Sequence, residues 1–255
     1  MTGRFRLDAP RRVATAKMAN FLTTKVPRDH RETDEAYRRR RRVVTGVSVM
    51  GAGMLGASLS TKPGSTAFYV STLGVAGTWV VGGFASGPLH RGWSLADDNS
   101  LRRPLTTPIL TGVGAFGLFY AGALVARKIP VLNTALCNIL RFADEGSSPL
   151  VLFTTLANGA AEEVFFRGAV YAAVGPRHPV LKSTAVYALA TVATRNVALV
   201  LAGTVVGTLF ALQRRASGGI QAPLLTHLTW ATLMLRYMPP LFRRPDDDRQ
   251  PELRA

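Results

Sequence analysis

Two carboxylates and a guanidinium lie within six positions of an apolar stretch, as Glu162, Glu163 and Arg167. A charge at the centre of a membrane helix costs about 2.5–3.5 kcal/mol to insert, so such residues pair or face a wet cavity, and they mark functional sites. The four-residue spacing predicts that Glu163 and Arg167 pair along one helix face. Glu162 is turned from Glu163 by about 100°, and it can act as a general base toward water. The alternative is a buried ion-pair network that only fixes helix packing.

A histidine in the last apolar stretch is the second candidate. His227 lies inside a predicted span, whereas His30, His90 and His178 lie in a tail, a loop and a turn. Neutral imidazole is a common metal ligand and a good proton shuttle. We therefore expect Glu162 to face a cavity that it shares with His227. The alternative is a histidine that hydrogen-bonds to a neighbouring helix.

The first cluster resembles a family motif. The run Glu162-Glu163-Val-Phe-Phe-Arg167 matches the Glu-Glu-x-x-x-Arg motif of the CPBP family, also called the CAAX-protease or Abi family of intramembrane metalloproteases. That family includes the type II CAAX prenyl endopeptidases. The resemblance covers about residues 148–242, and the motifs follow in family order on successive predicted helices.

The other two motifs of this family are each matched in part. The second is an aromatic residue, three others and a histidine, and the matching stretch here runs from Tyr187 to Thr191. The third is a histidine, three others and an asparagine or similar residue, and it runs here from His227 to Ala231. Threonine and alanine therefore stand where the family has a histidine and a polar group.

The resemblance implies an endopeptidase that hydrolyses a peptide bond in a membrane-associated protein or peptide. It implies that Glu162 activates the attacking water and that Glu163 and Arg167 support it. It also implies that His227 binds metal or stabilises the oxyanion, with a divalent metal such as zinc held by Glu162 and His227. A catalytic zinc normally has three protein ligands, so the changes at Thr191 and Ala231 leave a second reading open. In that reading the chain is a non-catalytic membrane scaffold or binding protein that keeps the family core.

The elements that position these residues are predicted to be membrane helices. Hydrophobic residues make up 47% of the chain and charged residues 18%, and a membrane span needs about 20 mostly apolar residues. The fold class predicted is all-α, a polytopic transmembrane bundle of about seven spans. They fall at about 43–60, 67–87, 108–126, 150–174, 180–194, 197–213 and 220–242, and a short amphipathic surface helix falls within 128–147. A small-solute transporter is disfavoured, because no pair of interrupted spans repeats in two halves.

The predicted organisation has four parts. Residues 1–42 form a basic cytoplasmic tail, and residues 43–147 hold the first three spans and the interfacial helix. Residues 148–242 form the family-like core, in which Gly203 and Gly207 make a Gly-x-x-x-Gly packing face. Residues 243–255 form a charged tail. The single cysteine, Cys137, excludes an internal disulfide.

The basic charge is concentrated at the amino terminus. The first 42 residues hold 13 of the 31 lysines and arginines, and Arg38 to Arg42 stand directly before the first apolar run. Basic residues hold such a segment start on the cytoplasmic side and attract anionic headgroups. We therefore expect a multi-pass protein of the cell membrane with a cytoplasmic amino terminus. The lipid bilayer is its expected partner, and nucleic acid is not.

Overall fold

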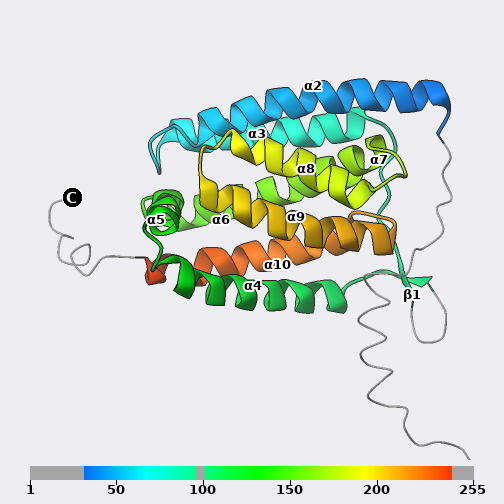
Figure 1. Ribbon diagram of the computed structural model, residues 1–255. Helices are drawn as coiled ribbons and strands as arrows, with labels where there is room; N and C mark the ends of the chain where they lie inside the picture. The colour runs from blue at the N-terminus through cyan, green and yellow to red at the C-terminus, as the bar shows by residue number, and fades with distance from the viewer. Residues whose placement is uncertain (1–31, 96–100, 243–255) are drawn as a thin grey trace, which may run out of the picture.

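The protein is described by a computed structural model that covers residues 32–95 and 101–242. Its helices run side by side in a bundle (Figure 1), as the all-α prediction required. The helices are α2 (Asp34–Ser58), α3 (Thr66–Ala85), α4 (Thr106–Ala126), α5 (Pro130–Asp144), α6 (Ser148–Glu162), the π-helix η1 (Glu163–Val170), α7 (Tyr171–Ala173), α8 (Pro179–Val192), α9 (Val197–Ser217), α10 (Gln221–Tyr237) and the 3-10 helix η2 (Pro239–Leu241).

Each of the seven predicted spans contains a helix of this bundle. Three of the helices, α3, α4 and α9, are long and apolar enough to cross a membrane. Large apolar side chains also remain exposed on the bundle, among them Phe84 and Leu118. A surface that displays such side chains along long helices suits lipid rather than water, so the chain is a helical membrane protein.

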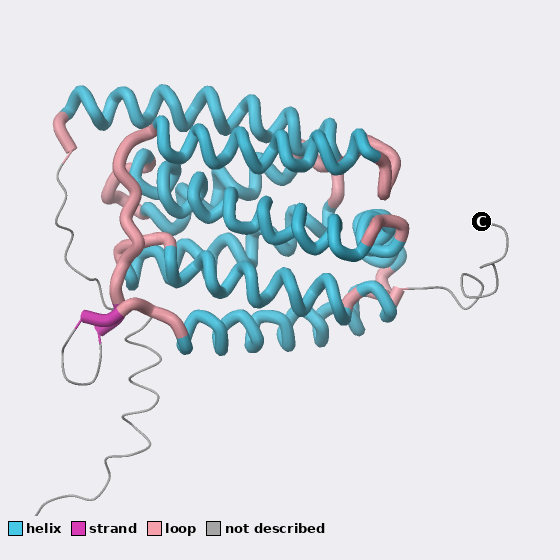
Figure 2. Tube along the Cα trace, turned by 180° about the vertical axis from the view of Figure 1, so that it is seen from behind, coloured by secondary structure: helices cyan, strands magenta, loops and turns pink. Residues whose placement is uncertain are grey.

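Helix α5 lies across one end of the bundle, where Figures 1 and 2 both show it nearly end-on beside the other helices. Pro130 occupies its first turn, a position where the missing N–H of proline costs nothing. The Asn196 side chain donates to the Ala135 carbonyl at 2.7 Å and so ties α5 to the start of α9. The predicted surface helix is thus present, with bounds narrower than 128–147.

The first helix begins earlier than predicted. The Thr33 hydroxyl accepts from Ala36 N at 3.2 Å and caps α2, so the last residues of the predicted tail 1–42 are helical. Residues 1–31 and the predicted tail 243–255 lie outside the described residues. Capping by threonine satisfies backbone donors that a helix start leaves open, and it lets α2 extend beyond its apolar part.

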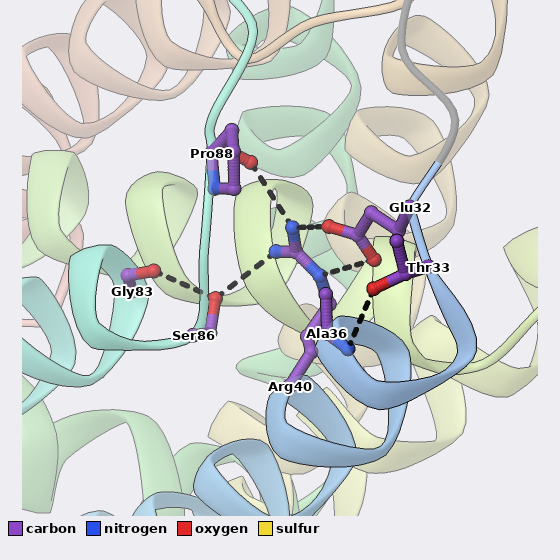
Figure 3. Close-up of polar contacts among 7 residues, drawn as sticks. All are labelled: Glu32, Thr33, Ala36, Arg40, Gly83, Ser86 and Pro88. Carbon is purple, nitrogen blue, oxygen red and sulfur yellow. Dashed lines mark hydrogen bonds and ion pairs between the residues drawn. The ribbon is translucent and has the colours of Figure 1, made fainter.

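The arginine block from Arg38 to Arg42 serves two purposes. Arg40 is buried and forms an ion pair with Glu32. Its guanidinium also donates to Ser86 Oγ at 3.1 Å and to the Pro88 carbonyl at 3.3 Å (Figure 3). Arg40 therefore fastens the start of α2 to the segment after α3. The other four arginines are exposed, and their role as a cytoplasmic topological anchor stays a prediction.

The segment between the second and third predicted spans contains a short hairpin of β1 (Ser94–Leu95) and β2 (Leu101–Arg102). The Trp93 N–H donates to the Ser217 carbonyl at 2.8 Å. The Arg103 guanidinium lies 3.6 Å from the centre of the Trp93 ring, which is a cation–π geometry. This loop is thereby fixed against the end of α9.

Candidate active site

The predicted charged cluster lies where one long helical segment changes its winding. Helix α6 ends at Glu162, and the chain continues from Glu163 as the π-helix η1 before α7 completes the segment. π-Helical turns are rare and occur frequently at functional sites. The wider turn places Glu163 and Arg167 in the π-helix and leaves Glu162 at the end of the preceding α-helix.

Glu163 is the centre of a buried ionic network. Arg167 Nη1 lies 3.2 Å from Glu163 Oε1, so the predicted pairing along one helix is confirmed. His227 Nδ1 from α10 lies 2.9 Å from the same oxygen. Glu163, Arg167 and His227 have exposed fractions of 0%, 2% and 6%. Since an ionised carboxylate only accepts hydrogen bonds, Nδ1 of the imidazole donates to Glu163.

The other imidazole nitrogen of His227 is directed toward α6 at a glycine. A Cβ atom at Gly159 would lie 3.4 Å from His227 Nε2, so the absence of a side chain at this position makes room for the ring. The Phe210 ring stacks on the imidazole with centroids 4.8 Å apart. His227 is thus held by a carboxylate on one nitrogen and by rings and backbone around it.

Two arginines bind η1 and α9 to each other in a reciprocal way. Arg167 of η1 donates to the Gly207 carbonyl of α9 at 3.4 Å. Arg214 of α9 donates through Nε to the Arg167 carbonyl at 2.7 Å. The Arg167 guanidinium also lies 4.4 Å from the centre of the Tyr187 ring. Helices η1 and α9 are therefore joined by hydrogen bonds in both directions. These bonds restrict the movement of the Glu163 side chain.

Glu162 faces a pocket beside this network, as predicted. The pocket has a volume of about 690 Å³ and is lined mostly by apolar side chains of α3, α4, α5, α6, α9 and α10. Of the described residues that line it, the ionisable ones are Glu162, Tyr187 and His227. The prediction of a cavity shared by Glu162 and His227 is thus confirmed. An apolar pocket with a few convergent polar groups is typical of a ligand site.

The carboxylate of Glu162 has a close partner that the sequence pattern does not predict. The Tyr187 hydroxyl of α8 donates to Glu162 Oε2 at 2.6 Å. In the sequence, Tyr187 stands out only as the aromatic residue of the second family motif. The signal available in the sequence was its hydroxyl group, which a phenylalanine at that position would lack.

The predicted Gly-x-x-x-Gly face of α9 seats this tyrosine. A Cβ atom at Gly207 would lie 2.8 Å from Tyr187 Cδ1, and one at Gly203 would lie 3.3 Å from Thr191 Oγ1. A contact below 3.0 Å would force a neighbour to shift. The two glycines therefore let α8 approach α9 closely, which confirms the predicted packing face and explains how Tyr187 reaches the pocket.

The two positions that depart from the family motifs also converge on this pocket. Thr191 and Ala231 both line it. The Thr191 hydroxyl donates to the Tyr187 carbonyl at 2.9 Å, a bond within its own helix. The fold therefore brings residues of all three motifs together, although two of the motifs each contain one side chain that differs from the family pattern.

The donor set does not fit the catalytic zinc that the resemblance implies. Glu162 and His227 offer two ligands, whereas such a zinc usually has three from the protein. The Thr191 hydroxyl is a poor ligand and is bonded to backbone. Within residues 32–95 and 101–242, no group of three or more His, Cys, Asp and Glu side chains is arranged to hold a metal ion.

Comparison with known proteins gives one family match. Residues 145–233 match the family described as type II CAAX prenyl endopeptidase Rce1-like. This range contains every motif position named above, from Glu162 to Ala231. No curated protein and no solved structure matches the chain. The motifs, their convergence on one pocket and this match agree that the chain carries, over residues 145–233, a domain of the type II CAAX prenyl endopeptidase Rce1-like family.

Proposed function

We propose that this protein is an intramembrane endopeptidase of the CAAX-protease type, which hydrolyses a peptide bond in a membrane-associated protein or peptide. One observation carries the proposal. The Glu162 carboxylate, held by Tyr187 at 2.6 Å, lies in a largely apolar pocket together with His227. A carboxylate in such surroundings is suited to take a proton from water, and a pocket of this size admits a peptide side chain or an apolar anchor.

The first chemical step assigns one role to each oxygen of Glu162. Oε2 accepts the Tyr187 hydroxyl, so Oε1 is available to accept a hydrogen bond from water. Glu162 removes a proton from this water as the oxygen adds to the carbonyl carbon of the scissile peptide. The C=O bond becomes a C–O⁻ single bond in the tetrahedral intermediate. General-base assistance of this kind contributes typically 10²–10⁴-fold.

The oxyanion and the leaving amine use the remaining groups. When His227 is protonated, Nδ1 still donates to Glu163, and Nε2 also carries a hydrogen that can be donated to the oxyanion. Glu162 then gives its proton to the leaving nitrogen as the C–N bond breaks. The products are a carboxylic acid and an amine, which balances the addition of one water.

A scaffold without activity is the second candidate, and one observation favours it. Thr191 and Ala231 line the same pocket as Glu162, so both departures from the family pattern lie at the site itself. Ala231 has no side-chain donor for an oxyanion. In the enzymatic reading, His227 must supply that stabilisation without help from position 231.

The first prediction separates these two candidates. We expect the purified protein, in lipid vesicles, to cleave members of a set of membrane-anchored reporter peptides. Because the donor set does not fit a catalytic zinc, we expect cleavage to survive exhaustive chelation. We also expect the purified protein to hold less than one metal ion per chain, and we expect the His227→Ala variant to hold the same amount of metal. Metal analysis and reporter cleavage measured on the same preparation test both expectations.

The outcomes of this experiment lead to different conclusions. Absence of cleavage of every reporter by folded protein would favour the scaffold. Cleavage that is lost on chelation and restored by zinc would return a metal to the mechanism. His227→Ala should then also lower the bound metal, which connects the metal to this site rather than to the surface.

We further propose that the protein lies in the cell membrane with its amino terminus on the cytoplasmic side. The exposed arginines Arg38, Arg39, Arg41 and Arg42 at the start of α2 lie at the same end of the bundle as the carboxyl end of α9 (Figure 1). That end of α9 carries Arg214 and Arg215. Basic residues accumulate on the cytoplasmic side of membrane proteins. Helix α5 lies at the opposite end and would face outward.

The second prediction tests this orientation with two cysteines at opposite ends. Cys137→Ser provides the background, and Glu35→Cys and Asn138→Cys each add one exposed cysteine, on α2 and α5. We expect a membrane-impermeant maleimide to label Asn138→Cys in intact cells and Glu35→Cys only after permeabilisation. Labelling of Glu35→Cys in intact cells, with Asn138→Cys protected, would reverse the orientation.

A further inference from the structure

We infer that Tyr187 is the residue that positions the Glu162 carboxylate for catalysis, through a hydrogen bond from its hydroxyl group. This inference rests on the proposed function. The second family motif contributes a histidine at the position that Thr191 occupies here, and the Thr191 hydroxyl is bonded to backbone. The side chain that contacts Glu162 from α8 is instead Tyr187, one turn earlier.

The hydrogen bond has the geometry expected of a strong contact. Its oxygen–oxygen distance of 2.6 Å lies in the range of about 2.5–2.7 Å that is typical of a hydroxyl donating to an ionised carboxylate. Tyr187 is 9% exposed, so water competes little for the hydroxyl. A charge-assisted bond in such surroundings holds both groups firmly.

The tyrosine ring is contacted on several sides, so its hydroxyl group is held in one position. The Phe166 ring meets it edge-on with centroids 4.8 Å apart. The Arg167 guanidinium lies 4.4 Å from the ring centre, and Gly207 leaves the space that the ring fills. Arg167 belongs to the network that also holds Glu163. The ring therefore connects the position of Glu162 to the buried network behind it.

A catalytic consequence follows from which oxygen is occupied. With Oε2 bonded to Tyr187, the carboxylate is restricted in rotation and presents Oε1 to water. Without the hydroxyl, Glu162 can rotate, and its ionised form loses a hydrogen bond in a mostly apolar pocket. The turnover number should therefore fall, whereas binding of substrate to the apolar lining should not change.

Tyr187→Phe tests the inference because it removes the hydroxyl and keeps the ring contacts. We expect kcat to fall about 10- to 100-fold, the loss expected for one hydrogen bond to a charged group, with KM unchanged. Tyr237→Phe is the matched control. Tyr237 is exposed and lies outside the pocket lining, so this variant should resemble the wild type.

A second measurement keeps the inference testable apart from the proposed function. 3-Fluorotyrosine placed at position 187 reports the surroundings of the hydroxyl by ¹⁹F NMR in detergent. We expect its resonance to shift in Glu162→Gln and to stay in place in Glu145→Gln. If the resonance does not shift in Glu162→Gln, the inferred contact between Tyr187 and Glu162 is wrong, whether or not the protein cleaves peptides. If the wild type cleaves and Tyr187→Phe keeps full kcat, the positioning role is wrong and the proposed function stands.

Discussion

Glu162→Gln is expected to abolish cleavage while the helix bundle stays folded. A general base contributes typically 10²–10⁴-fold, so we expect kcat/KM to fall by at least about 10²-fold. The amide keeps the shape of the carboxylate, and its oxygen can still accept the Tyr187 hydroxyl, which lies 2.6 Å from Glu162 Oε2. The change also removes a charge from a mostly apolar pocket, where a charge is costly. The midpoint of thermal unfolding of Glu162→Gln in detergent should therefore stay the same or rise.

Glu145→Gln is the matched control for this substitution. Glu145 carries the same side chain, and it pairs with Arg141 on the exposed side of α5, outside the pocket. The measurement is cleavage of a membrane-anchored reporter beside thermal unfolding of both variants. Full cleavage by Glu162→Gln would remove the carboxylate from the mechanism. Loss of folding in Glu162→Gln would show instead that this carboxylate has a structural role.

The parts of the site that could be predicted from sequence are those that depend on local spacing. Glu163 and Arg167 are four positions apart, and they pair at 3.2 Å because neighbours at this spacing lie on one helix face. Gly203 and Gly207 form a packing face for the same reason. These relations are set within one helix, so neither needs knowledge of which helices become neighbours.

The parts that could not be predicted depend on packing between helices. His227 bonds to Glu163, which requires α10 to lie against η1. The π-helix itself has no evident cue in its sequence. Phe165 stacks on Trp79 with centroids 4.8 Å apart, and Phe166 lies against Tyr187 at the same distance. Contacts of this kind are made by residues far apart in the chain, so the local sequence does not predict them.

Two helix ends were misplaced although the sequence carried usable signals. The last helix was predicted to run to residue 242, yet α10 ends at Tyr237. Pro239 and Pro240 follow, and proline disfavours a helical conformation at the residue before it. At the other end, Thr33 with Asp34 and Glu35 behind it has the composition of a helix start. The arginine charge is typical of a tail, whereas α2 continues through it.

Breaking the buried pair is expected to cost much more stability than breaking an exposed pair of the same type. Glu163 and Arg167 are 0% and 2% exposed, so removal of one partner leaves a charge without compensation inside the bundle. Such a loss costs about 3–5 kcal/mol, and we expect Glu163→Gln and Arg167→Ala each to lose activity and stability together. The Arg141–Glu145 pair has the same four-residue spacing but is 60% and 26% exposed. Glu145→Gln should therefore change stability by only about 0.3–0.5 kcal/mol.

The double variant Glu163→Gln/Arg167→Ala decides whether pairing is the cause. If each single variant loses stability because its charged partner is left unpaired, the double variant should lose clearly less stability than the two single variants together. No unpaired charge then remains in the bundle. Free energies of unfolding in detergent measure this coupling. Additive losses would instead assign the cost to side-chain volume and to the bond between Glu163 and His227. Cleavage should stay low in the double variant in either case, since the imidazole loses the carboxylate that lies 2.9 Å from its Nδ1 and holds it in place.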